Sequence, residues 1–118
     1  MGSGAGSGDL AALEGRLNRI LDPYRAHLEA ATIYGIPTLR RPGAKAHDWF
    51  AFVKPASKHV GFYLLPIAND AALLESLSPA LRRRLTGKSV FTFAALDEGL
   101  LTELEGVVAR AFEAYTGG

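Results

Sequence analysis

The stretch that decides the fold is HDWFAFVKPASKHVGFYLL, residues 47–65. Two runs within it, 47–53 and 59–65, are rich in aromatic and β-branched residues and flank the segment Lys54–Lys58. Such runs are typical of strands, and a short polar segment with a proline between them indicates a hairpin loop. We therefore predict two antiparallel strands joined by a loop of five residues.

Symmetric closure of this loop predicts three cross-strand pairs: Val53 with His59, Ala51 with Gly61, and Trp49 with Tyr63. Side chains alternate between the two faces of a sheet, so one face becomes almost purely apolar. That face is the predicted core and carries Phe50, Phe52, Val60, Phe62 and Leu64, joined by Phe91 and Phe93. The opposite face has small residues at its centre and polar-tipped aromatic residues around them, which predicts a shallow concavity.

Upstream of this hairpin, apolar residues in 10–32 recur at helical spacing, with Asp9 as N-cap and a break at Pro23. We predict one bent helix or two abutting helices there, followed by a short strand over 36–41. Downstream we expect a helix over 70–77 capped by Asn69, a helix from Ser78 to near Leu85, a strand over 89–94, and a last helix capped by Asp97. The predicted fold class is α+β, with a mainly antiparallel four-stranded sheet, helices packed on one face, and the order ααβββααβα.

The length of 118 residues suits a single domain, which we place at 9–118. Residues 1–8, MGSGAGSG, indicate a flexible linker or an expression remnant. The absence of cysteine excludes disulfides, thiolate metal sites and cysteine nucleophiles. No apolar run approaches the roughly 18 residues of a membrane span. We therefore expect a cytoplasmic protein with no membrane partner.

The charge is unevenly distributed, although the net charge is only +1. Residues 36–90 contain nine Lys and Arg against three acids. A basic segment attracts phosphate or nucleic acid, and the residues available for this are Arg40, Arg41, Lys45, Arg82–Arg84 and Lys88. The simpler interpretation is an ordinary solvated surface. Anion or nucleic-acid binding is therefore an alternative function, and nucleic acid is not the partner we expect.

The histidines do not predict a metal site. His47 and His59 share a predicted face, but six residues of about 3.3 Å each separate them by about 20 Å. His27 lies in the predicted helical region, with no spacing that links it to either. The sequence also has no hydrolase elbow, phosphate-binding loop, zinc-protease motif or dinucleotide fingerprint. We therefore predict no enzyme, no cofactor and no metal site.

Four segments carry a family resemblance: Tyr34–Thr38 (YGIPT), Trp49–Phe52 (WFAF), Lys58–Tyr63 (KHVGFY) and Gly87–Phe93 (GKSVFTF). In this order and spacing the chain resembles the YdhG-like family of small bacterial domains of unknown function, over about residues 30–112. The resemblance implies an α+β fold that is compared with frataxin. Some members of that family are described as iron chaperones, so the resemblance also implies an iron-binding function.

The first helical region departs from the frataxin-like pattern of iron binding, which relies on an acidic ridge. Its acids, Asp9, Glu14, Asp22 and Glu29, are interleaved with Arg16, Arg19 and Arg25. Hard cations such as iron need several converging oxygen ligands, and this region lacks that density of carboxylates. We keep a frataxin-like iron chaperone as an alternative function.

Our leading hypothesis is a non-enzymatic binding or interaction domain that uses the open face of the sheet. The predicted ligand-binding residues are Trp49, His59, Gly61, Tyr63 and Lys88. An aromatic pair beside small residues is suited to a planar ligand, and a lysine at a strand entrance can hold an anion. The simpler interpretation is that each of these residues serves the fold. The expected partner is a small molecule or a protein, and a second copy of the chain is among the candidates.

Overall fold

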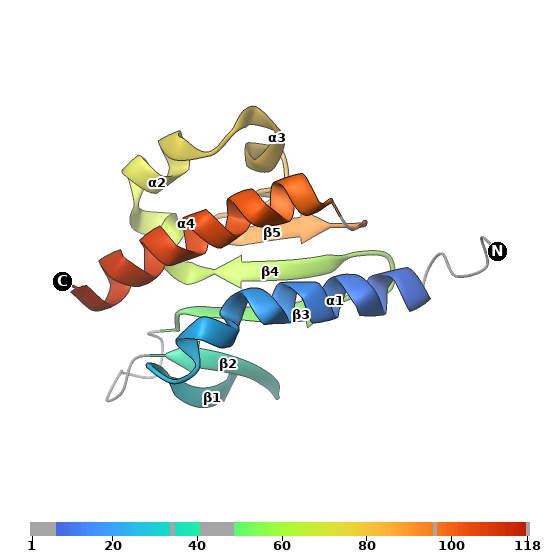
Figure 1. Ribbon diagram of the computed structural model, residues 1–118, viewed down its shortest axis with the longest axis horizontal. Coiled ribbons are helices and arrows are strands. Elements are labelled where there is room, and N and C mark those ends of the chain that lie inside the picture. The colour runs from blue at the N-terminus through green and yellow to red at the C-terminus, as the bar shows by residue number, and fades with distance from the viewer. Residues whose placement is uncertain (1–6, 34, 41–48, 96, 118) are drawn as a thin grey trace.

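The computed structural model describes residues 7–33, 35–40, 49–95 and 97–117 (Figure 1). Its elements in chain order are α1 (Ser7–Leu21), the 3-10 helix η2 (Asp22–Tyr24), β1 (Glu29–Ile33), β2 (Ile36–Arg40), β3 (Ala51–Pro55), β4 (Val60–Leu64), the 3-10 helix η3 (Leu65–Asn69), α2 (Ala71–Ser76), α3 (Pro79–Arg82), β5 (Val90–Phe93) and α4 (Glu98–Gly117). The strands form one five-stranded antiparallel sheet in the order β1-β2-β3-β4-β5. The α+β class is confirmed.

The two long helices cover one face of this sheet. Figure 1 shows α1 and α4 lying side by side over the sheet, with α2 and α3 beyond β5. Apolar residues at helical spacing on both helices point into the core, among them Leu13, Leu17, Leu101, Leu104 and Val108, all 0% exposed. We call the face of the sheet turned away from these helices the open face.

The helical segment predicted over 10–32 is correct only for its first part. The helix α1 ends at Leu21, and β1 (Glu29–Ile33) stands where a second helical segment was expected. The sheet therefore has five strands instead of four. Gly35, with φ at +80°, lets the chain reverse between β1 and β2, a conformation that costs glycine little. Pairing with β2 along the whole of β1 outweighs the helical preference of residues 29–31.

The start of α1 also differs from the prediction. The helix begins at Ser7, so Asp9 lies inside it instead of before it. Residues 1–6 of the predicted linker lie outside the described residues, as do three of the basic or histidine residues discussed above: Arg41, Lys45 and His47.

The other helix caps follow the prediction with one correction. The N-cap of α2 is Asp70, whose side chain accepts a hydrogen bond from the Leu73 N–H at 3.0 Å, and not Asn69. The predicted caps Ser78 and Asp97 are confirmed. The Ser78 side chain accepts from the first turn of α3, and the Asp97 carboxylate accepts from the first turn of α4.

The β3–β4 hairpin has a different register from the predicted one. The observed pairs include Ala51 with Leu64, Val53 with Phe62, and Pro55 with Val60. The connection is therefore shorter than expected, residues 56–59, and a hydrogen bond of 2.8 Å from the Ala56 N–H to the His59 carbonyl closes it. The pairing differs from the predicted one by an odd number of residues, so β3 presents the opposite set of side chains to the helices.

Because of this register, the predicted assignment of β3 side chains to the two faces of the sheet is wrong. The predicted assignment for β4 and β5 is confirmed. Ala51 and Val53 lie in the core, and Phe52 lies on the open face, where it stacks on Tyr63 with ring centroids 4.4 Å apart and planes within 7°. Phe50 precedes β3 and, like Ala51, is buried in the core, so the alternation is interrupted there. The remaining predicted core residues are confirmed as buried: Val60, Phe62, Leu64, Phe91 and Phe93.

A carboxylate on α4 ties the last helix to the junction of α2 and α3. Glu103 accepts two hydrogen bonds from Ser78, one from the backbone N–H at 2.8 Å and one from the hydroxyl at 2.7 Å. The same hydroxyl accepts from the Leu81 N–H at 3.1 Å. The cap of α3 is therefore held in place by the side chain of another helix.

We expect Glu103→Ala to lower the free energy of unfolding by about 1–3 kcal/mol, because a half-buried N–H and hydroxyl lose their charged acceptor. Urea unfolding of the variant measures this loss. Glu113→Ala is the matched control, since Glu113 is an exposed carboxylate on the same helix. The control should change stability by less than about 0.5 kcal/mol. Equal losses in the two variants would contradict the structural role of Glu103.

Candidate functional site

The open face carries a hollow of about 230 Å³ near the β3–β4 loop. We call it the open-face hollow, and it is lined by Lys54, Ala56, His59, Gly61, Tyr63, Thr86, Val90 and Thr92. Antiparallel pairing of β3, β4 and β5 builds it, because Lys54 lies opposite Gly61 and Gly61 lies opposite Thr92. Residues directly opposite each other in a sheet share a face, so this row of three residues faces away from the helices.

One side of the hollow is formed by the chain that returns along β5. The Thr86 N–H donates to the Val90 carbonyl at 2.9 Å, and the Thr92 N–H donates to the Arg84 carbonyl at 2.8 Å. This pairing brings the hydroxyls of Thr86 and Thr92 within 2.7 Å of each other, so they form a hydrogen bond. Two hydroxyls therefore sit on the β5 side of the hollow.

Gly61 forms the floor of the hollow, and a side chain at this position would crowd the walls. A Cβ atom built there would stand 3.1 Å from Tyr63 Cε1 and 3.3 Å from Val90 Cγ2. A strand glycine often marks such a close approach. The Tyr63 ring is also held from the other side by its stacking on Phe52. The apolar wall of the hollow is thus fixed in position by the sheet.

The structure brings together three of the five predicted ligand-binding residues, His59, Gly61 and Tyr63. Trp49 is not with them, and its predicted pairing with Tyr63 is wrong. Trp49 precedes β3, at the end of the hairpin opposite to His59, and the Arg40 guanidinium carbon lies 5.6 Å from the centroid of its ring. Arg40 is itself paired with Glu29 at 2.7 Å.

The sequence did not predict five residues that line the same hollow: Lys54, Ala56, Thr86, Val90 and Thr92. A signal for Thr92 was present, because it alternates with Phe91 and Phe93, which were assigned to the core. Thr86 had no such signal, since its position depends on the return of the chain along β5. Lys54 was assigned to the loop, and the true register makes it a strand residue.

Lys88, the fifth predicted site residue, belongs to a separate hollow of about 280 Å³. We call this the basic-corner hollow, and it is lined by Ala68, Asn69, Leu74, Arg82, Leu85, Gly87 and Lys88. The connection from α3 to β5 lies between the two hollows, with Thr86 in the open-face hollow and Gly87 in the other. The predicted site is therefore split between two places.

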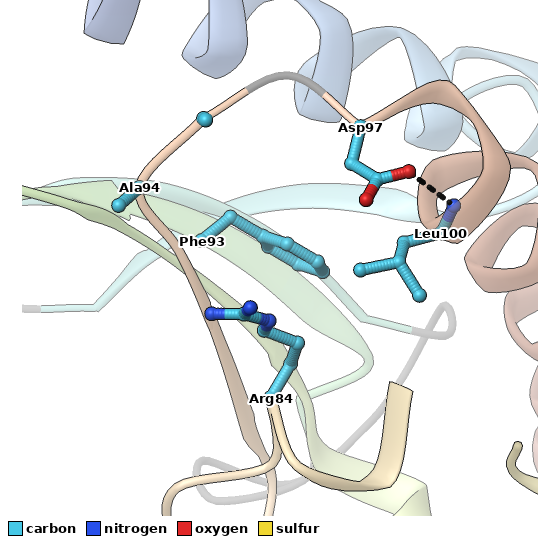
Figure 2. A pocket seen from close by; sticks show the side chains of 6 residues that line it. Arg84, Phe93, Ala94, Asp97 and Leu100 are labelled. Carbon is cyan, nitrogen blue, oxygen red and sulfur yellow. Dashed lines mark hydrogen bonds between the residues drawn. The ribbon is translucent and has the colours of Figure 1, made fainter. Parts of the chain in front are cut away.

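A smaller hollow, of about 140 Å³, lies beside the start of α4 (Figure 2). Figure 2 shows the Arg84 side chain beside the ring of Phe93, with Asp97 and Leu100 on the other side. The Asp97 carboxylate already accepts a hydrogen bond from the Leu100 N–H at 3.2 Å, which caps the helix. We assign no ligand to this hollow, because its helix terminus is satisfied and its volume is well below that of the other two.

In the described part of the chain two groups have shifted pKa values, and packing of the helices explains both. The pKa of Arg16 on α1 is raised, mainly by its hydrogen bonds to Glu98, with a smaller contribution from Glu105 of the same helix α4. Burial raises the pKa of the Tyr24 phenol, and the charges of Glu105 and Glu113 add to this. These shifts reflect contacts between helices and do not mark a reactive site.

Within the described residues, no three His, Asp or Glu side chains lie close enough together to hold a metal ion. His27 lies beside Phe112, with ring centroids 6.2 Å apart, while His59 lies in the open-face hollow. An iron-chaperone function therefore remains a prediction that rests on the family resemblance.

No family model, no curated protein and no solved structure matches this chain. Membership of the YdhG-like family accordingly stays a prediction, and a proposal about function has to rest on the geometry of the hollows. None of the helices in the described part of the chain combines the length and the apolar character needed to cross a membrane.

Proposed function

We propose that this protein is a binding domain that takes up a small single-ring carboxylate in the open-face hollow. The observation that carries the proposal is the combination, over Gly61, of a fixed aromatic wall and a rim of hydrogen-bond donors. Ligand sites set convergent polar groups against an apolar wall, and here the polar groups of Lys54, His59, Thr86 and Thr92 stand beside the Tyr63 ring and Val90.

The chemistry of the rim favours an acidic ligand. Lys54 contributes an ammonium group, His59 an imidazole, and Thr86 and Thr92 contribute hydroxyls, while no carboxylate of the described residues lines the hollow. Lys54 has no ion-pair partner among the described residues. A ligand carboxylate would supply the missing acceptor, and hydrogen bonds to an ionised acceptor are stronger than neutral ones.

The size and walls of the hollow limit the rest of the ligand. Its volume of about 230 Å³ is below the roughly 300–1,000 Å³ of sites for drug-sized molecules. Tyr63 and Val90 provide the apolar wall, against which a flat ring can pack. A single aromatic or heteroaromatic ring with one carboxylate therefore satisfies both the wall and the rim.

The arrangement favours binding over catalysis. A hydroxyl nucleophile needs a base within hydrogen-bond distance. Here the hydroxyls of Thr86 and Thr92 bond to each other, and no hydrogen bond joins either of them to His59. The polar groups are placed to contact a ligand without activating one another.

The proposal is tested with benzoate, nicotinate and salicylate as probes, followed by backbone amide shifts in NMR spectra. We expect saturable shifts that centre on Gly61 and Thr92. Gly61→Ala should weaken binding by about tenfold or more, since the new methyl group displaces the Tyr63 ring. Gly106→Ala is the matched control, because a Cβ there meets nothing closer than the end of the Arg110 side chain at 3.8 Å.

A second pair of variants tests the charge of the rim. Lys54→Gln should weaken binding, whereas Lys58→Gln should leave it unchanged, because Lys58 lies in the adjacent loop and does not line the hollow. Absence of saturable shifts at Gly61 with every probe, or equal loss in the two lysine variants, would refute the proposed function.

A further inference from the structure

The end of α3 and the chain that follows it toward β5 contain four cations within seven residues, 82–88: Arg82, Arg83, Arg84 and Lys88. In the structure these four cations do not form one continuous basic surface. Leu85 forms a bridge with Phe91, and the hydrogen bonds of Thr86 and Thr92 hold the segment along β5. As a result Arg84 lines the hollow at the start of α4, while Arg82 and Lys88 line the basic-corner hollow.

The cations of the described residues fall into two groups: those paired with a carboxylate, and those without such a partner, which include Lys54, Arg82, Arg83 and Lys88. Arg16, Arg25 and Arg40 are each paired with an acid at 2.7–3.1 Å. Arg82 and Lys88 form no ion pair among the described residues, and no acid lines their hollow. Two positive charges in one hollow repel each other, so a bound anion would relieve this repulsion.

The remaining lining residues indicate which chemical groups of a ligand, besides the anion, the hollow can contact. Asn69, at the end of η3, offers an amide, which can donate to an oxygen of an anion. Leu74 of α2 and Leu85 are apolar and half-buried, and Ala68 of η3 adds a third apolar side chain to the lining. One part of the hollow is therefore cationic and polar, and another part is apolar.

We infer that the basic-corner hollow binds a phosphate monoester that carries a small apolar group. A phosphate monoester has a charge of about −1.5 to −2 near neutral pH, which matches the two cations. A carboxylate, with a single charge, would leave one of them unpaired. The planar guanidinium of Arg82 suits two phosphate oxygens, and Lys88 acts as a point charge. The apolar group of the ligand lies against Leu74 and Leu85.

This site is independent of the carboxylate site proposed on the open face, so each can fail without the other. The probe is phenyl phosphate, titrated at low and at physiological salt and followed by backbone amide shifts. We expect saturable shifts at Asn69, Leu85 and Gly87, with Gly61 unaffected. Binding should weaken as salt is raised, since both cations are exposed and therefore screened.

Arg82→Gln and Lys88→Gln should each weaken phenyl phosphate binding by several-fold, and the double variant by about tenfold or more. The matched control is Arg83→Gln, which removes the same charge from the neighbouring residue without changing the lining of the hollow. Its binding should stay within about twofold of the parent protein. Lys88 and Arg82 are exposed, so these variants should fold, and the dispersion of their NMR spectra verifies this.

Comparison ligands distinguish specific binding of a phosphate monoester in this hollow from nonspecific attraction of anions to a basic surface. Inorganic phosphate and benzoate should both bind more weakly than phenyl phosphate, because the first lacks the apolar group and the second lacks the second charge. The inference is overturned if Arg83→Gln is as damaging as Arg82→Gln, or if inorganic phosphate binds as tightly as phenyl phosphate. It is also overturned if a single-stranded oligonucleotide binds more tightly and shifts residues across the whole segment 82–88, which would indicate a nucleic-acid surface.

Discussion

Phe62→Ala should lower the free energy of unfolding by about 3–5 kcal/mol, the usual cost of removing a fully buried phenylalanine ring. Phe62 is 0% exposed at the centre of β4, on the face that α1 and α4 cover. It lies opposite Val53 on one side and Phe91 on the other, and both are buried. Removal of the ring therefore opens a cavity that neighbouring side chains can fill only in part.

Guanidinium unfolding measured by the fluorescence of Trp49, the single tryptophan of the sequence, gives this loss directly. Tyr63→Ala is the matched comparison, because it removes the next ring along the same strand from the open face. Tyr63 is only half-buried, so its loss should be clearly smaller. A cost below about 1 kcal/mol for Phe62→Ala, or a larger cost for Tyr63→Ala, would mean that the two faces of β4 are reversed.

Phe50→Ala should cost a similar amount, about 3–5 kcal/mol, for a different reason. Phe50 is fully buried, and its ring lies at the centre of an aromatic cluster that joins the sheet to η2 and α4. The ring centroids of its neighbours stand at 6.0 Å for Tyr24, 5.8 Å for Phe112 and 5.3 Å for Tyr115. Such pairs add about 0.5–1.5 kcal/mol each beyond the burial of area.

Circular dichroism during thermal and urea unfolding is the suitable measurement for Phe50→Ala, because Trp49 is the adjacent residue and its fluorescence would change locally. A double-mutant cycle with Phe112→Ala provides the control. The Phe50 and Phe112 rings meet edge to face at 79°, so the double variant should lose less than the sum of the single losses. Strict additivity would show that α4 does not dock on Phe50.

Much of the fold could be predicted from local pattern. The helical spacing in α1 and α4, the strands β2, β4 and β5, and the caps Ser78 and Asp97 all follow from residues close together in sequence. Strand β1 could not be predicted in this way, since residues 29–31 favour a helix by propensity. Only pairing with β2, made possible by the turn at Gly35, turns this segment into a strand.

The candidate site could also be predicted only in part, because its composition depends on how strands distant in sequence pair with each other. The aromatic and glycine pattern of β4 identified Gly61 and Tyr63, and both line the open-face hollow. We predicted Trp49 as the cross-strand partner of Tyr63, whereas in the structure Phe52 pairs with Tyr63 and stacks on its ring. That error came from the loop, because a sequence with Lys54–Lys58 between two strands permits more than one closure.

The sequence by itself determined the α+β class, the apolar face of β4 and β5, and the basic character of the segment 82–88, because each of these depends on which residues follow one another. The tertiary structure decided the register of the β3–β4 hairpin, and with it which β3 side chains face the helices. It also decided that Thr86 and Lys88 line different hollows. The physical reason is that hydrogen bonds between distant backbone groups set the register, and an odd change in register moves every side chain of a strand to its other face.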